Sequence, residues 1–174
     1  MKMILLTAAV TSILSVPALA SDNLSAFHVG YAHSEQDISS ASINGSSKSN
    51  GMNLGVDLNR IFSVDITYTT GTQNNIDFSQ GRAALNIGYT FGNEEFNIKP
   101  YGGVGINRNK LEAPIMGTTV TISDTSFAPS VGLKATFFKY GYASLDYSIG
   151  EFDTGYEVPD LDTTTFSIGA NFPF

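Results

Sequence analysis

The chain has 174 residues, 42% of them hydrophobic, and its formal net charge is −7. This acidic balance argues against a nucleic-acid partner, because phosphate binding requires clustered lysine and arginine side chains. The chain contains no cysteine, which excludes disulfide bonds and thiol chemistry.

Residues 1–20 have the pattern of a cleaved signal peptide. Lys2 supplies a short positive segment, an apolar run covers residues 4–14, and an Ala-Leu-Ala cleavage pattern occupies residues 18–20. The apolar run is shorter than the roughly 20 residues that a membrane-spanning helix needs. We therefore expect an exported protein whose mature chain, residues 21–174, forms a single domain with a net charge of −8, since Lys2 is lost.

The mature chain shows eight segments in which apolar residues alternate with small or polar ones, as in β-strands with two different faces. They lie near residues 25–34, 52–58, 62–68, 82–91, 96–106, 127–137, 142–149 and 164–174. In the last segment Phe166, Ile168, Phe172 and Phe174 share one face, which is typical of the closing strand of an outer-membrane barrel. The sequence therefore predicts an all-β fold, an eight-stranded antiparallel up-and-down transmembrane β-barrel.

The connections alternate between short and long. Short links fall at residues 59–62, 92–95 and 138–141, and longer ones at residues 35–50, 71–80, 110–125 and 150–162. Bacterial outer-membrane barrels have short periplasmic turns and longer extracellular loops. We therefore expect an outer-membrane protein with extracellular loops and with both mature termini in the periplasm.

Aromatic residues gather at the two ends of the predicted strands, as expected for side chains at the headgroup level of a bilayer. Five of them, including Tyr31 and Phe127, lie near the outer rim. The predicted periplasmic membrane interface consists of Phe62, Tyr89, Phe91, Phe96, Phe137, Phe172 and Phe174.

Three acids and three bases fall on the predicted inner face of the strands. An eight-stranded barrel has an interior only wide enough for its own side chains, and buried charges are costly unless they are paired. We therefore expect a lumen filled by an ion-pair network rather than an open channel, with a small porin as an alternative. The predicted network consists of Asp57, Asp65, Arg82, Lys99, Lys134 and Asp146.

The chain offers little for catalysis. His33, Ser34 and Glu35 are adjacent, which leaves an outer-leaflet lipid-modifying enzyme of the lipid A deacylase type as an alternative. Neighbouring residues of a strand point to opposite faces, however, and the chain has no G-x-S-x-G sequence. No residues have zinc-site or EF-hand spacing. We expect no catalytic residue, metal or cofactor. One alternative is that the acids of residues 153–162 weakly bridge divalent cations to lipopolysaccharide.

Several segments resemble the OmpX/Ail family of small outer-membrane barrels, with opacity-protein-like and OmpA-like barrels as close relatives. They are V-G-Y-A-H-S, G-M-N-L-G-V-D-L, I-K-P-Y-G-G-V-G-I-N, S-V-G-L-K-A, A-S-L-D-Y-S and F-S-I-G-A-N-F-P-F. The resemblance implies a monomeric, non-enzymatic barrel in contact with the lipid bilayer and lipopolysaccharide. It also implies loops that act in adhesion to host surface or matrix proteins, in virulence or in serum resistance. The barrel-assembly machinery would recognise Phe172 and Phe174, although Pro173 departs from the usual basic or polar penultimate residue.

One predicted loop contains the strand-prone stretch 118–122, Thr-Thr-Val-Thr-Ile. It is either a simple hairpin extension of the two neighbouring strands or an exposed edge that captures a partner by strand addition.

Overall fold

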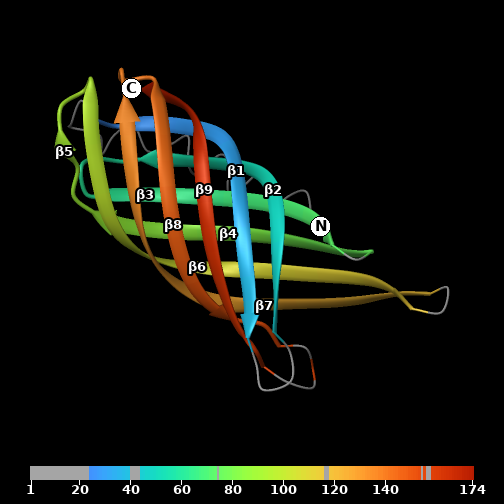
Figure 1. The fold of residues 1–174 in the computed structure, drawn as a ribbon. Coiled ribbons are helices and arrows are strands. Elements are labelled where there is room, and N and C mark those ends of the chain that lie inside the picture. Colours follow the sequence, from blue (N-terminus) through green and yellow to red (C-terminus); the bar gives the residue numbers. More distant parts are fainter. Residues whose placement is uncertain (1–23, 40–43, 74, 116–117, 154, 156–157) are drawn as a thin grey trace, which may run out of the picture.

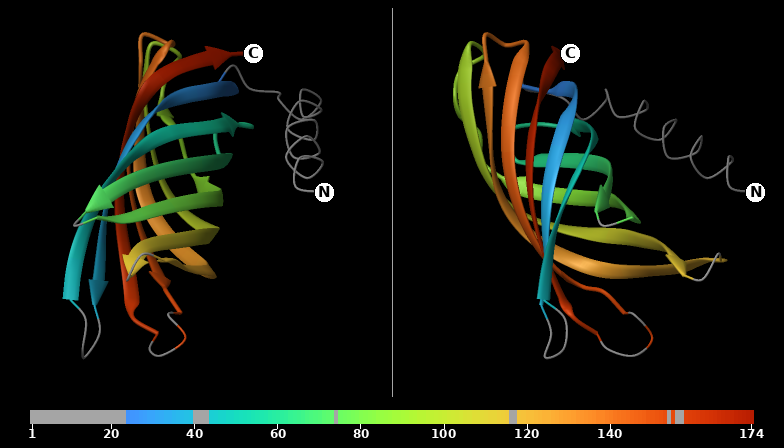
Figure 2. Two further views of the ribbon diagram at one scale, coloured as in Figure 1. Left: turned by 90° about the vertical axis from the view of Figure 1, so that its right-hand side faces the viewer. Right: turned by 45° about the vertical axis from the view of Figure 1, so that its right-hand side comes forward.

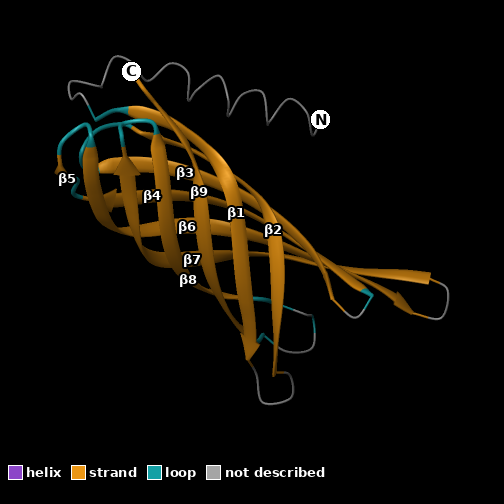
Figure 3. Ribbon diagram, turned by 45° about the horizontal axis from the view of Figure 1, so that its top comes forward, coloured by secondary structure: helices purple, strands orange, loops and turns teal. Residues whose placement is uncertain are grey.

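The computed structural model describes residues 24–39, 44–73, 75–115, 118–153, 155 and 158–174. All regular structure in these residues is β-strand (Figure 3). No helix in this part of the chain is long and apolar enough to cross a membrane. The expected leader, residues 1–20, lies outside the described residues.

Eight long strands and one very short one follow each other along the described chain. They are β1 (Ala26–Ser39), β2 (Asn44–Asp57), β3 (Phe62–Gln73), β4 (Ile76–Gly88), β5 (Phe91–Gly92), β6 (Phe96–Ile115), β7 (Thr118–Phe137), β8 (Gly141–Glu151) and β9 (Asp160–Pro173). The prediction of one strand over residues 82–91 is wrong at its end, because β4 stops at Gly88. The separate strand β5 then leads into a turn at Gly92, whose φ of 118° favours glycine.

The sheet closes on itself. Its strands run in the order β4-β3-β2-β1-β9-β8-β7-β6, all antiparallel, and β4 also pairs with β6. The pairing of β1 with β9 brings Ala26 opposite Pro173. We call this end of the barrel the terminal end and the opposite end the loop end; the C-terminus marks the terminal end at the top of Figure 1. The predicted eight-stranded antiparallel up-and-down barrel is confirmed.

Side chains alternate between the two faces of each strand, and the barrel is apolar on its outside. On β6, Val104 and Ile106 are 48% and 58% exposed, whereas Asn107 is fully buried. On β7, Val131 is 61% exposed and Lys134 only 7%. An apolar outer surface around a polar interior is the reverse of a water-soluble barrel and is typical of barrels that face lipid.

Most residues predicted as long loops are strands instead. The β1–β2 ladder continues to the pair Ser39 and Asn44, and the β6–β7 ladder to the pair Ile115 and Thr118. The sequence indicated loops there because the apolar alternation stops. Outside a bilayer a strand needs no apolar face, since hydrogen bonds between the backbones are enough to continue the ladder.

Toward the loop end the strands separate into two leaves. β7 pairs with β8 only from Ser130 onward, and β2 pairs with β3 only from Asn50 onward. The first leaf contains the loop-end parts of β8, β9, β1 and β2, and the second leaf those of β3, β4, β6 and β7. In Figure 1 and in the right-hand view of Figure 2, the loop-end part of the β6–β7 hairpin points away from the loop-end parts of β1 and β2.

This separation leaves one edge of β7, residues 118–129, without a strand partner among the described residues. The register fixes which backbone groups lie on that edge. The N–H of Phe138 donates to the carbonyl of Glu95, so even-numbered residues of β7 are the ones that bond to β6. Odd-numbered residues such as Thr121 therefore direct their N–H and C=O groups away from β6 and toward the open edge.

This register predicts an alternating pattern of amide hydrogen exchange in residues 119–127. Amides of even-numbered residues should be protected by their bonds to β6, and those of odd-numbered residues should exchange faster by roughly tenfold or more. NMR measurement on the protein in micelles checks this. Uniform protection would show that another strand covers the edge, and uniform fast exchange would show that the hairpin does not form.

Candidate functional site

The structure places all six charged residues of the predicted network in the lumen and brings them into two clusters. In the first cluster, Asp57 accepts bonds from two lysines: its Oδ2 lies 2.5 Å from Lys134 Nζ and its Oδ1 lies 3.3 Å from Lys99 Nζ. All three residues are at most 8% exposed. Two bases around one acid leave a positive charge that needs a further partner nearby.

The further partner is Asp65, and His28 connects it to the first cluster. Lys134 Nζ lies 2.9 Å from His28 Nδ1, and His28 Nε2 lies 2.7 Å from Asp65 Oδ1. An ammonium group can only donate, so Nδ1 accepts, and the imidazole proton sits on Nε2 and is donated to Asp65. Asn86 donates to the other oxygen of Asp65 at 2.6 Å. The chain of contacts from Asp57 to Asp65 therefore balances two acids against two bases.

The second cluster is built around Asp146. Arg82 Nη1 donates to Asp146 Oδ1 at 2.7 Å, and Arg82 Nη2 donates to Ser130 Oγ at 2.6 Å. The hydroxyl of Tyr101 donates to Asp146 Oδ2 at 3.2 Å. Each oxygen of this carboxylate thus has its own donor, and the cluster is electrically neutral.

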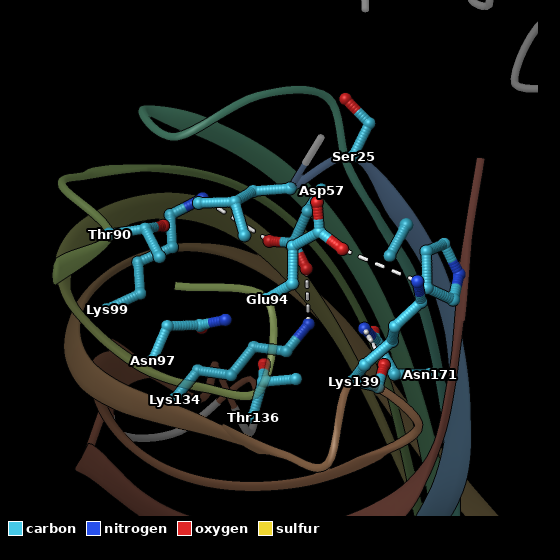
Figure 4. Close-up of a pocket in the computed structure, with 13 residues that line it drawn as sticks. Ser25, Asp57, Thr90, Glu94, Asn97, Lys99, Lys134, Thr136, Lys139 and Asn171 are labelled. Carbon is cyan, nitrogen blue, oxygen red and sulfur yellow. Dashed lines mark hydrogen bonds and ion pairs between the residues drawn. The ribbon is translucent and has the colours of Figure 1, made fainter. Parts of the chain in front are cut away.

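Rings packed against glycines fill much of the remaining lumen, and a small cavity is left at the terminal end. A Cβ at Gly132 would overlap the ring of Tyr101, and one at Gly55 would overlap the ring of His28. Figure 4 looks into the cavity at the terminal end, where Lys99 and Lys134 point at Asp57. Its volume is about 30 Å³, room for a water molecule or two.

The aromatic residues predicted for the membrane interface lie at the terminal end, with exposures between 37% for Phe137 and 59% for Phe91. Two further aromatics, Phe138 and Tyr140, are exposed there by 80% and 62%. The sequence reasoning missed them because they fall in a turn, where strand alternation gives no signal.

The loop end is acidic. Its described residues include nine acids and three bases: Glu35, Asp37, Asp77, Glu112, Asp124, Glu151, Asp153, Asp160 and Asp162 against Lys48, Arg108 and Lys110. Glu35 and Lys48 face each other across β1 and β2, with 2.6 Å between Oε1 and Nζ. This hydrogen bond holds the pKa of Glu35 below its usual value and raises the pKa of Lys48.

The residues considered for catalysis do not converge. Ser34 points inward and shares a hydrogen bond of 2.8 Å with Thr165, whereas His33 Nδ1 lies 2.8 Å from Asn50 Oδ1. Among the described residues no three His, Asp or Glu side chains form a group that could hold a metal ion. Glu157, one of the acids considered for cation bridging, lies outside the described residues.

The family model for the outer membrane protein beta-barrel domain matches residues 6–174. The chain belongs to this family. Comparison with curated protein sequences gives no significant match. The family match and the closed barrel confirm the small outer-membrane barrel that the resemblance implies, and they place the protein in the outer membrane.

Solved structures of three small barrels are similar to this outer-membrane chain. The attachment invasion locus protein Ail of Yersinia pestis is 21% identical, with a TM-score of 0.54, and the match covers 87% of this chain and 99% of Ail. Neisserial surface protein A is 19% identical, with a TM-score of 0.57 and coverage of 85% and 97%. The N-terminal β-barrel domain of Pseudomonas aeruginosa OprF is 14% identical, with a TM-score of 0.58 and coverage of 87% and 98%. At these identities the likeness concerns the fold.

The paired lumen predicts that Lys134→Met destabilises the barrel. The substitution removes one donor of Asp57 and the only donor to His28 Nδ1 among the described residues. Loss of one partner from a buried charged cluster costs roughly 3 kcal/mol, which should lower the urea midpoint of unfolding in detergent micelles. The matched control is Lys139→Met, which breaks an exposed pair with Glu94 and should change stability by less than about 1 kcal/mol. Equal midpoints for the two variants would contradict a dry, paired lumen.

Proposed function

We propose that this outer-membrane barrel is a non-enzymatic surface protein that acts through the strands at its loop end, in adhesion to host surface or matrix proteins. The single observation that carries the proposal is the open edge of β7, residues 118–129. Soluble proteins protect such edges with charges, bulges or a covering segment, because a row of free N–H and C=O groups captures other strands. Here the odd-numbered edge residues are mostly Thr and Ser, uncharged and exposed.

Strand addition suits a long hairpin of this kind. Main-chain hydrogen bonds supply the affinity in this mode, and alternate side chains supply the specificity. On β7, Thr119, Thr121 and Ser123 point to the outer face, and Val120 is 41% exposed on the other. An extended segment of a partner protein would therefore pair with the backbone and meet small hydroxyl side chains on one side.

The charge of the loop end favours a neutral or basic partner. One solved structure of Ail is a complex with the heparin analogue sucrose octasulfate, a polyanion. In the present chain, nine acids against three bases at the loop end would repel such a ligand. The adhesion partner that fits this surface is therefore a protein segment rather than a sulfated polysaccharide.

The proposal includes the placement of the barrel in its membrane. The residues that support the periplasmic interface are Phe62, Tyr89, Phe91, Phe96, Phe137, Phe172 and Phe174, all exposed at the terminal end. Aromatic side chains at that level anchor a barrel at the headgroups, and Phe172 and Phe174 are the residues offered to the assembly machinery. The loops then face outward, next to lipopolysaccharide, and the barrel works as a monomer.

Two alternatives differ in what they require of the lumen and the rim. A porin requires a continuous water path, which the paired charges and the small cavity of about 30 Å³ at the terminal end disfavour. An outer-leaflet lipid enzyme requires Ser34 and His33 to meet, yet Ser34 is fully buried and bonded to Thr165. Measurable single-channel conductance would favour the first alternative, and a change in lipid A upon expression would favour the second.

The edge is tested by Thr121→Pro. Proline removes an N–H that points to the open edge, so the ladder with β6 keeps its bonds while an added partner strand loses one. A lost hydrogen bond is worth about 1 kcal/mol, and binding of bacteria to cultured epithelial cells should fall by about fivefold. Thr121→Val, which keeps the N–H and loses only the hydroxyl, should lose clearly less binding than Thr121→Pro. Equal binding by all three, with equal heat-modifiable mobility, would rule out strand addition at this edge.

The orientation is tested with two single cysteines in a chain that has none of its own. Thr119→Cys lies on the exposed tip region of β7, and Lys139→Cys lies in the turn after β7 at the terminal end. A membrane-impermeant maleimide added to intact cells should label the first and leave the second unlabelled until the cells are broken. Labelling of Lys139→Cys alone in intact cells would invert the proposed topology.

A further inference from the structure

The loop end contains a cavity between the two leaves that the proposed adhesion does not use. Its volume is about 180 Å³. Its apolar lining comes from both leaves and from the β8–β9 connection and consists of Ile38, Ile76, Phe78, Leu111, Phe152 and Leu161. A cavity of about 150 Å³ with Leu, Ile and Phe walls is large enough for benzene. The present cavity therefore has room for a ring or a short hydrocarbon chain.

The apolar lining belongs to the inward-facing side of the strands and to the buried Phe152 of the β8–β9 connection. Leu111 continues the inward-facing row of Asn107 and Asn109 on β6, so the row changes from polar to apolar toward the loop end. Leu161 and Phe152 are only 2% and 5% exposed. Contact with lipid does not explain these apolar residues, because lipid lies on the outside of a barrel.

Two buried amide side chains add polar groups to the cavity. Gln36 and Asn109 both line it and are each 6% exposed. Gln36 Nε2 and the two polar atoms of Asn109 make no hydrogen bond to any described protein atom. Buried polar groups are nearly always hydrogen-bonded, and an apolar pocket with a few convergent polar groups is the usual form of a small-molecule site.

The charges around the cavity select the head group of the ligand. Lys110 also lines the cavity, but its Nζ lies 2.8 Å from Glu112 Oε1, so its charge is already balanced. The surrounding loop end is acidic and would repel a carboxylate. Among the lining side chains, the buried N–H donors without a described partner are those of Gln36 and Asn109, and they suit a neutral carbonyl oxygen.

We propose that this cavity binds a small neutral amphiphile, with its hydrocarbon chain among the apolar residues and its amide or ester carbonyl at Gln36 and Asn109. Octanamide is a suitable probe for the whole protein in phospholipid nanodiscs. Its addition should cause saturable NMR shifts of the side-chain NH₂ signals of Gln36 and Asn109. Gln36→Leu should weaken the binding by about fivefold, because it removes one hydrogen bond and keeps the apolar wall.

A matched control is Asn107→Leu. Asn107 is also a buried amide without a described partner, but it does not line the cavity. Octanamide should bind this variant unchanged. Leu161→Trp should abolish the shifts by filling the cavity. The proposal is overturned if the shifts do not saturate, if they persist in Leu161→Trp, or if octanoate binds as well as octanamide. Thr121→Pro should bind octanamide normally, so failure of the adhesion proposal leaves this test intact.

Discussion

Closure of the backbone hydrogen-bond network is the constraint on which the rest of this structure depends. Within a bilayer no water satisfies a free N–H or C=O group, so each strand needs a partner on both sides. The pairing of β1 with β9 and of β4 with β6 meets this requirement for the whole ring. Closure also fixes the two environments of the side chains: lipid outside and a narrow enclosed space inside.

The enclosed space makes charge pairing unavoidable. Asp57 with its two lysines, His28 between Lys134 and Asp65, and Arg82 against Asp146 together leave little uncompensated charge in the lumen. Such a filled interior is suited to a rigid stem and ill suited to conduction, which would require hydrated charges along a continuous path. The proposed recognition therefore belongs to the parts of the strands at the loop end, beyond the filled lumen.

Past the bilayer the closure requirement no longer holds, because water satisfies free backbone groups. The two leaves separate there, as Figure 2 shows, and the separation has two consequences. It opens the edge of β7, residues 118–129, to solvent, and it creates an interior space between the leaves. Both candidate binding features of this protein therefore arise from the same loss of constraint, one on the rim and the other inside it.

The sequence alone determined which face of each strand a residue occupies, because side-chain direction alternates with every residue. It thereby predicted eight strands, the apolar outer surface and the inward position of residues such as Asp57 and Arg82. Only the tertiary structure decided that Asp57 pairs with Lys99 and Lys134, that β7 has an open edge, and that Leu111 and Leu161 share a cavity. These features depend on register and on where neighbouring strands part, which are contacts between residues far apart in the chain that no local alternation encodes.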